Sequence, residues 1–209
     1  MPRIVDHDLY RISLLDRCGQ LFVEHGYAAL SMRQIAEHLK VSTGTLYHYF
    51  ESKEDLFRKL VHHVGNVDLS RWHELLGNVT DPAERLDIFL HQVEADEAYW
   101  LSQYLVICDY ARAVGHANFA ADPTLAEATR RYHDLLSELL GVPPHLFVFI
   151  DNFIGGLLMN RFLVGGGVSF NEQARLLRAM LALYQAEHSA SAPTPDGIQL
   201  PSTEGESNE

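Results

Sequence analysis

The sequence predicts an all-α protein in which a small N-terminal three-helix domain precedes a larger helical domain, with about nine helices in total. Three observations predict this class. Capping residues recur along the chain, and each is followed by an apolar stripe of helical spacing. Glycines and prolines punctuate these stripes. No segment alternates between apolar and polar residues over several positions, so no sheet is expected.

The first helix is predicted at about residues 9–25, after a short flexible arm at residues 1–8. Its apolar stripe has the spacing i, i+1, i+4, i+7 and i+8 and consists of Leu14, Leu15, Cys18, Leu21 and Phe22. Gly26 follows as a helix stop. Because Cys18 lies on this stripe, we interpret it as a small buried hydrophobe.

Residues 31–56 predict two short helices joined by a tight turn, followed by the start of another helix. Ser31, Ser42 and Ser52 are placed to cap these three helices, and Lys40 with Val41 forms the turn. The second helix has one buried face and one polar face, the latter made of Thr43, Gly44, Thr45, Tyr47, His48 and Tyr49. Small hydroxyls, a glycine and aromatic hydrogen-bonding groups suit contact with phosphates and base edges. The pattern indicates a helix-turn-helix whose second helix reads DNA.

The same stretch resembles the DNA-binding domain of the TetR family of transcriptional regulators. The resemblance rests on Ile35-Ala36, Val41-Ser42, Gly44-Thr45-Leu46-Tyr47, Tyr49-Phe50, Ser52-Lys53-Glu54 and Leu56. Lys40 departs from it, because the family usually has a turn glycine there, and a non-glycine residue costs about 1 kcal/mol in a left-handed turn. The resemblance implies that Tyr47, Tyr49 and Lys53 clamp phosphates, while Thr43, Thr45 and His48 face bases. The full predicted DNA-binding set is Arg33, Ser42, Thr43, Gly44, Thr45, Tyr47, His48, Tyr49 and Lys53.

Charge divides the 209-residue chain into two parts. Residues 1–64 hold eight Lys or Arg and eight Asp or Glu, whereas residues 65–209 hold eight basic and twenty acidic residues, so the net charge of −12 lies in the second part. That part should face away from DNA. The two cysteines suggest neither a zinc site nor a disulfide framework. We see no signal peptide and no uncharged apolar run of membrane-spanning length, so we expect a soluble cytoplasmic protein without a membrane partner.

Further helix boundaries follow from caps and stops. We predict a connecting helix at residues 52–65, a less regular stretch from Asn66 to Thr80, and then five helices. Their starts are at Asp81-Pro82, near Asp96, at Asp122-Pro123, at Pro143-Pro144 and at Ser169. The predicted organisation is an arm at 1–8, the helix-turn-helix domain at 9–51, the connecting helix, a ligand-binding and dimerisation domain at 66–188, and a disordered acidic tail at 189–209.

Aromatic residues concentrate in the second domain and predict an apolar cavity with a few polar groups. The candidate ligand-binding residues are Phe89, Trp100, Tyr104, Cys108, Tyr132, Asn152 and Phe153. A packed core with the same stripes stays an alternative, as does a sensing role for Cys108. The expected partner is a small effector of unknown identity, with an apolar or aromatic one favoured, because no Lys or Arg cluster offers to bind an anion.

The last two helices are more apolar than a monomer needs, which favours a homodimer. The resemblance implies a four-helix seam formed by two copies of this pair. The predicted interface residues are Phe147, Ile150, Ile154, Gly155, Leu158, Leu177, Leu181 and Tyr184. Gly155-Gly156 lies inside a helix at a cost of about 1 kcal/mol per glycine, which close approach of another backbone would explain.

Three function classes stay open at this point. The first is a ligand-responsive repressor that binds a palindromic operator in double-stranded DNA, as the resemblance implies. The second is an activator or architectural DNA-binding protein without a small ligand. The third is an enzyme, which no phosphate loop, dinucleotide fingerprint, nucleophile elbow or HExxH motif supports. We expect no cofactor and no metal, since the twelve histidines form no HxxxH pair.

Overall fold

The computed structural model describes residues 7–165 and 167–190, which form ten helices and no strand. The predicted all-α class is confirmed. The described residues belong to two units, with the boundary between Phe170 and Asn171. The first unit holds α1 to α9 and both sites described below; the second is essentially α10 (Phe170–Ala190). Residues 1–6 of the predicted arm and 191–209 of the predicted tail lie outside the described residues.

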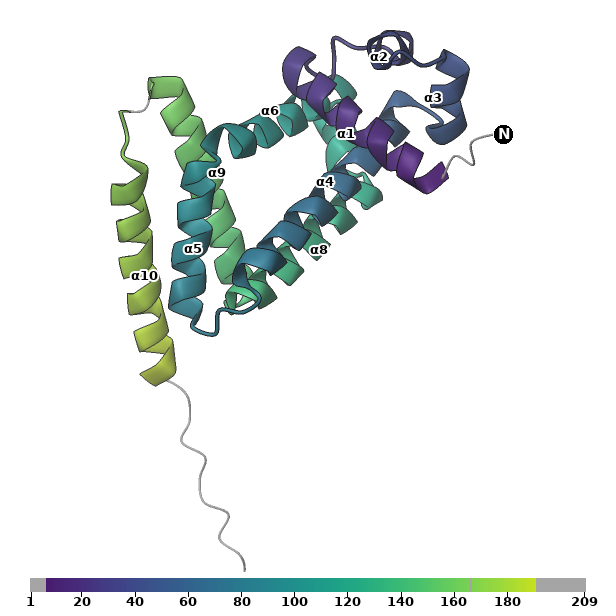
Figure 1. The fold of residues 1–209 in the computed structure, drawn as a ribbon. Coiled ribbons are helices and arrows are strands. Elements are labelled where there is room, and N and C mark those ends of the chain that lie inside the picture. The colour runs from purple at the N-terminus through teal and green to yellow at the C-terminus, as the bar shows by residue number, and fades with distance from the viewer. Residues whose placement is uncertain (1–6, 166, 191–209) are drawn as a thin grey trace, which may run out of the picture. The chain divides into compact units, whose positions relative to one another are not determined.

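The N-terminal domain consists of α1 (His7–His25), α2 (Met32–Leu39) and α3 (Thr43–Tyr49), closed by the first turns of α4 (Lys53–Leu76) (Figure 1). The predicted caps are present. Ser31 forms a reciprocal capping box with Gln34, and Ser42 and Ser52 accept hydrogen bonds from the backbone amides of Thr45 and Asp55. Lys40 occupies the left-handed turn position with φ of +56°, as predicted.

A single apolar core holds these helices together. Its fully buried members include Leu14, Cys18, Phe22, Ile35, Leu46, Phe50, Leu56 and Phe57. The core continues into the second domain through Tyr110 and Leu125, so the two predicted domains share apolar contacts instead of being joined by a free linker.

The helix α4 is longer than predicted, because the stretch from Asn66 onward continues it without a break to Leu76. Leu60, Val64, Asp68, Trp72 and Leu76 recur at intervals of four along one side, and Asp68 is as buried as its apolar neighbours. Asp68 interrupts the apolar row on the inward face, and for this reason the sequence pattern did not predict a helix here. As Figure 1 shows, α4 lies along α8 (Pro123–Leu140), and the two pack together.

The remaining helices of the first unit are α5 (Pro82–Ala95), α6 (Glu97–Val114), α7 (His116–Ala120) and α9 (Pro144–Val164). Their starts agree with the predicted caps, and α7 was not predicted because five residues are too short to show a period. Among the described helices, α9 alone is long and apolar enough to cross a membrane by length and composition. It packs against α6 and α8 through one side, on which Phe147, Ile150 and Leu158 are buried.

Candidate functional site

The outward face of α3 carries side chains that the sequence predicts to meet DNA. Thr43, Gly44, Tyr47 and His48 are exposed, and the Tyr47 side chain is 52% exposed. Leu46 is buried against the core and fixes which side of the helix faces outward. The exposed set has no acidic group, so a phosphate or base edge would meet no like charge on this face.

Other predicted DNA-binding residues are engaged within the domain. The Ser42 Oγ caps α3 and lies 2.7 Å from Thr45 Oγ1, so these two hydroxyls are bonded to each other. The Tyr49 hydroxyl lies 3.0 Å from His7 Nδ1. His7 was assigned to the arm, yet it begins α1 beside the recognition helix. The sequence alone does not show that His7 lies beside Tyr49, because the two residues are brought together only by the fold.

Lys53 holds the loop between α1 and α2. Its ammonium donates hydrogen bonds to the carbonyl oxygens of Tyr27 at 3.1 Å and Leu30 at 2.8 Å, and it lies 4.0 Å from the centre of the Tyr27 ring. A phosphate clamp by Lys53, as the resemblance implies, would have to share these donors. Arg33 is exposed on α2, consistent with the predicted approach to DNA.

Aromatic and polar contacts link the N-terminal domain to α6. The Tyr110 ring stacks on Phe57 at 4.1 Å and meets Tyr27 edge-on at 4.8 Å. Asp109 accepts a 3.0 Å hydrogen bond from the amide of Ala28, and this bond and the Arg112 guanidinium hold the pKa of Asp109 below its usual range despite burial. The loop that precedes the helix-turn-helix is therefore tied to α6.

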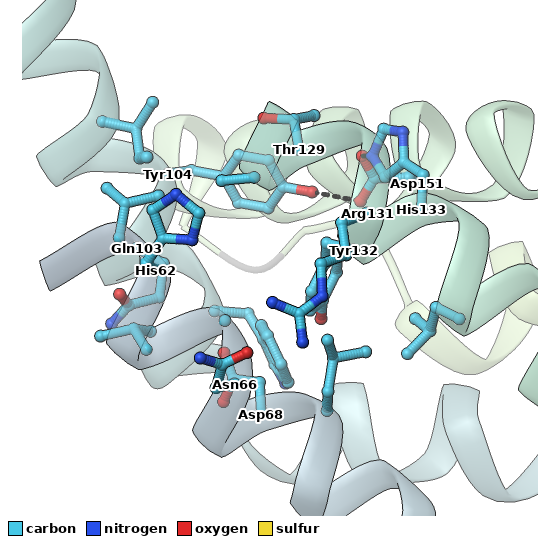
Figure 2. Close-up of a pocket in the computed structure, with 18 of the residues that line it drawn as sticks. His62, Asn66, Asp68, Gln103, Tyr104, Thr129, Arg131, Tyr132, His133 and Asp151 are labelled. Carbon is cyan, nitrogen blue, oxygen red and sulfur yellow. Dashed lines mark hydrogen bonds and ion pairs between the residues drawn. The ribbon is translucent and has the colours of Figure 1, made fainter. Parts of the chain in front are cut away.

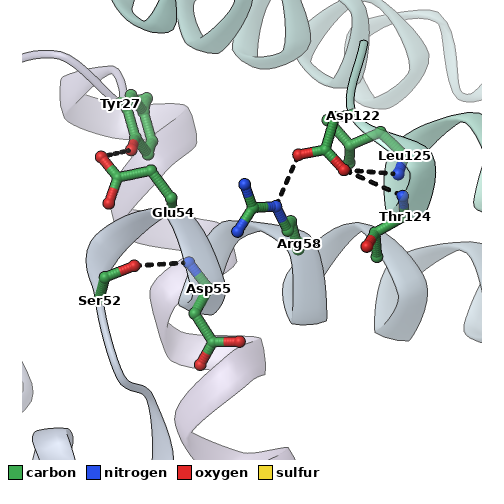
Figure 3. Close-up of polar contacts among 8 residues, drawn as sticks. All are labelled: Tyr27, Ser52, Glu54, Asp55, Arg58, Asp122, Thr124 and Leu125. Atoms are coloured by element: carbon green, nitrogen blue, oxygen red, sulfur yellow. Dashed lines mark hydrogen bonds and ion pairs between the residues drawn. The ribbon is translucent and has the colours of Figure 1, made fainter. Parts of the chain in front are cut away.

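A second link runs from α4 to the start of α8 (Figure 3). Arg58 donates a 2.6 Å hydrogen bond to Asp122, whose other oxygen caps α8 by accepting from the amides of Thr124 and Leu125. Burial raises the pKa of Asp122, but these hydrogen bonds outweigh it and the net shift is downward. The carboxylate is buried, so this pair fixes α8 against α4.

A cavity of about 340 Å³ lies in the second domain, between α4, α5, α6, α8 and α9. Most of its lining is apolar or aromatic, which is typical of small-molecule sites. Both tryptophans of the chain, Trp72 and Trp100, line it, and their rings stack at 5.7 Å. The predicted cavity is therefore present, and α6 forms one of its walls.

Acidic side chains lie at two places in the lining (Figure 2). The Tyr104 hydroxyl donates to Asp151 at 3.0 Å, and His133 Nε2 lies 3.3 Å from the same carboxylate. The other place is Asp68, which is 5% exposed and accepts a 2.8 Å hydrogen bond from the Tyr99 hydroxyl. Burial raises the pKa of Asp68 to about 6.

The cavity contains four of the seven predicted ligand-binding residues, namely Phe89, Trp100, Tyr104 and Tyr132. The other three do not line it. Cys108 and Asn152 are exposed, each one position along the helix from the lining residues Ile107 and Asp151, and Phe153 is half-buried outside the lining. One step along a helix rotates a side chain by about 100°, which explains these misses. Asp68, Trp72, His133 and Asp151 were not predicted. The signal available in the sequence was the place of Asp68 in an otherwise apolar row of residues spaced four apart.

The predicted dimer residues of α9 face inward. Phe147 and Ile154 line the cavity, Ile150 and Leu158 are buried, and a Cβ on Gly155 would lie 3.1 Å from the Tyr104 ring. The exposed side of α9 is rotated from these and carries Phe149, Asn152, Gly156, Asn160 and Leu163. The prediction was wrong on orientation because apolar residues occur on all sides of α9. Leu177, Leu181 and Tyr184 lie on α10, and their role stays a prediction.

Histidines and acids of the described residues form no group of three or more placed to hold a metal ion. Cys18 is buried, and burial raises the pKa of its thiol to about 12.

Comparison with known proteins identifies the N-terminal domain. Residues 14–60 match the family described as bacterial regulatory proteins, tetR family. The chain is 32% identical over 88 residues to the HTH-type transcriptional repressor KstR2 of Mycobacterium tuberculosis. This match covers 42% of the chain and 44% of the relative, so the chain spans less than half the length of that curated relative.

Solved structures resemble most of the fold. The fatty acid degradation regulator FadR from Bacillus halodurans matches with a TM-score of 0.62 at 19% identity, covering 82% of this chain and 94% of that one. FadR from Bacillus subtilis, solved in complex with stearoyl-CoA, matches with a TM-score of 0.59 at 16% identity and covers 83% and 97% of the two chains. At these identities the likeness shows the fold alone.

Proposed function

We propose that the chain, whose residues 14–60 match the TetR family of bacterial regulatory proteins, is a ligand-responsive transcriptional repressor. It would bind a palindromic operator in double-stranded DNA as a homodimer, in the cytoplasm, and leave it when a small apolar or aromatic effector enters the cavity. The single observation that carries this proposal is the capped helix-turn-helix whose α3 exposes an acid-free face of hydroxyl and aromatic side chains.

The proposed DNA-binding residues fall into two groups, those that are exposed and those that are already hydrogen-bonded within the domain. Tyr47, Thr43 and His48 are free to reach DNA, and Gly44 leaves room for the backbone of α3 to approach a groove. Arg33 would contact a phosphate. Ser42, Thr45, Tyr49 and Lys53 would act from hydrogen bonds they already make, chiefly by fixing the position of α3 and the loop before α2.

The homodimer is supported by two apolar faces. On α9 the exposed face includes Phe149 and Leu163, and a Cβ added to Gly156 would meet open space. On α10, Leu176, Met180 and Leu183 are more than half exposed and lie at i, i+4 and i+7. Exposed apolar stripes of this kind mark interaction surfaces, and a second copy is the partner that a two-fold operator requires.

Effector binding would be transmitted by α6. This helix contributes Trp100, Gln103, Tyr104 and Ile107 to the cavity. Asp109 and Tyr110, two and three residues after Ile107, contact the N-terminal domain. A shift of α6 on ligand entry would pull on the Ala28 amide and on the Phe57 ring. The two recognition helices of a dimer would then lose the spacing that suits the operator.

An activator or architectural protein without a small ligand is the second candidate. It shares the helix-turn-helix, so only the second domain separates the two functions. The aromatic-lined cavity favours the ligand-responsive function, and the repressor name of the M. tuberculosis relative favours repression.

The test is to incubate the purified protein with sheared genomic DNA of its host and sequence the retained fragments. We expect enrichment of one or a few sites that share a palindromic motif, with two half-sites spaced for two recognition helices. A Tyr47→Ala variant is the control and should retain far less DNA. Retention of random fragments by both proteins would overturn the proposal.

A further inference from the structure

Asp68 is the most unusual group in the cavity. Its side chain is buried among apolar and aromatic residues, and it accepts one hydrogen bond, from Tyr99, and makes no ion pair with any described residue. Arg71 is the cation that lowers the pKa of Asp68, but its guanidinium donates a hydrogen bond to Asp96. Burial raises the pKa of Asp68 to about 6, which leaves the carboxylate mostly ionised at neutral pH. A buried charge without a partner is costly, so this position is poised for a cation.

Asp151 adds a second carboxylate to the lining, but both of its oxygens already have partners within the protein. Tyr104 donates to one oxygen at 3.0 Å, and His133 lies 3.3 Å from the other. Figure 2 shows Asp151 and Asp68 on opposite sides of Tyr132. Burial raises the pKa of that tyrosine, and the charges of Asp68 and Asp151 raise it further. Asp151 therefore contributes negative potential, while Asp68 is the carboxylate with unused acceptor capacity.

The walls around these acids suit an organic cation. Trp72, Trp100, Tyr104 and Tyr132 present aromatic rings to the cavity, and ring faces attract ammonium groups. Trp100 Nε1 is buried without a hydrogen-bond partner in the described part of the chain, so an acceptor oxygen on the same ligand would give this donor a partner.

Anions fit the lining poorly. Arg131 is the single Lys or Arg among the described lining residues, and it is exposed. A carboxylate or phosphate placed deeper would face Asp68 and Asp151, and like charges in a poorly solvated space repel strongly.

We propose that the effector is an organic cation, a protonated amine on an apolar body, whose nitrogen pairs with Asp68 while the body lies among the aromatic side chains of the cavity. This inference rests on the proposed function, because it takes the cavity to be the effector site. It narrows the effector class from apolar or aromatic compounds in general to those with a basic nitrogen.

The test compares three probes with one apolar body and different end groups: 4-phenylbutylamine, 4-phenylbutanol and 4-phenylbutanoate. Binding is followed by tryptophan fluorescence, which reports the cavity alone because both tryptophans line it. At about pH 7.5 we expect the amine to bind at least about tenfold more tightly than the alcohol, since a charge-assisted hydrogen bond contributes about one to two tenfold steps. The carboxylate should bind most weakly.

Two variants locate the charge recognition. Asp68→Asn keeps the shape and the bond from Tyr99 but removes the charge, and it should reduce amine affinity to that of the alcohol. Arg131→Gln should leave the amine preference intact. Circular dichroism and thermal unfolding check that both variants fold. The proposal is overturned if the amine preference survives Asp68→Asn, or if the carboxylate binds most tightly and depends on Arg131.

DNA binding separates failure of this inference from failure of the proposed function. A protein that binds a specific palindromic DNA fragment but shows no amine preference is a regulator with a different effector, which overturns the inference alone. A protein that prefers the amine but binds no DNA supports the cation site and overturns the repressor. The addition of the amine to a protein–DNA complex should lower DNA affinity only in the chain that retains Asp68.

Discussion

Single residues carry the chemistry of both sites, and Asp68 is the clearest case. It stands in an otherwise apolar row of α4, where any apolar residue would pack without the cost of a buried charge. The Tyr99 hydroxyl on α6 donates a hydrogen bond to Asp68, and Arg71 on α4 partly lowers the pKa of Asp68. The charge of Asp68 in turn contributes to the raised pKa of Tyr132 on α8. A position that weakens folding in this way is typical of a functional site.

The raised pKa of Asp68 predicts a specific pH dependence of stability. The folded protein holds the Asp68 proton up to about pH 6, whereas the unfolded chain releases it near the ordinary value of 3.8. Stability from this group is therefore present below the unfolded value and is lost as the pH rises through about 6. Asp68→Asn should therefore have a higher free energy of unfolding than the wild type. We expect this gain to be about 1 kcal/mol larger at about pH 7.5 than at about pH 5. Urea unfolding at the two pH values measures this, and a pH-independent difference would refute it.

We expect the exposed residues of α3 to divide into those that hold DNA and those that select its sequence. Tyr47→Ala should weaken binding to specific and unrelated DNA by similar factors, since it removes a phosphate contact. Thr43→Ala should cost about 1–3 kcal/mol on the preferred site alone if the threonine faces a base. Anisotropy titrations with both DNAs compare the two variants, and equal losses for Thr43→Ala on both DNAs would place that residue on the backbone.

At the scale of elements, helix starts could be predicted and helix orientations could not. Ser31, Ser42, Asp81 and Asp122 are caps whose effect is local, so the sequence alone located them. The inward face of α9 depends on what packs against it, and apolar residues on all its sides leave that undetermined. For the same reason the stripe on α6 included Trp100 and Tyr104, which line the cavity, together with Cys108, which is exposed.

The two adjacent glycines of α9 offer a matched pair. Alanine at either position should gain about 1 kcal/mol of helix propensity. At Gly156 the new methyl group meets open space, whereas at Gly155 it would lie 3.1 Å from the Tyr104 ring, which Asp151 holds in place. We therefore expect Gly155→Ala to unfold at lower temperature than Gly156→Ala and to shift the tryptophan emission. The comparison is made at equal oligomeric state, and Gly155→Ala at least as stable as Gly156→Ala would contradict this packing.

At the scale of the whole molecule, binding to a palindromic operator requires two copies of the chain. Phe149 is 40% exposed on the proposed dimer face of α9, and a buried glutamate there would be an unpaired charge. Phe149→Glu should shift the protein from dimer to monomer in light scattering after size exclusion. Val67→Glu, at an exposed apolar position on α4, is the control and should stay dimeric. A dimeric Phe149→Glu protein would move the interface elsewhere.

The distribution of charge along the chain also bears on DNA binding. The eight basic and eight acidic residues before residue 65 make the proposed DNA-binding part neutral, so we expect DNA affinity to depend on a few positioned contacts instead of a general attraction. Binding should consequently fall steeply with the loss of one contact and less steeply with salt than it does for strongly basic proteins.

The most direct test of the central claim is a fluorescence anisotropy titration of the purified protein onto labelled DNA from upstream of its own gene, with unrelated DNA as competitor. We expect tight binding that survives the competitor, saturates at two protomers per site, and is lost in Tyr47→Ala. Absence of binding to any DNA, even at low salt, would contradict the function proposed for this protein.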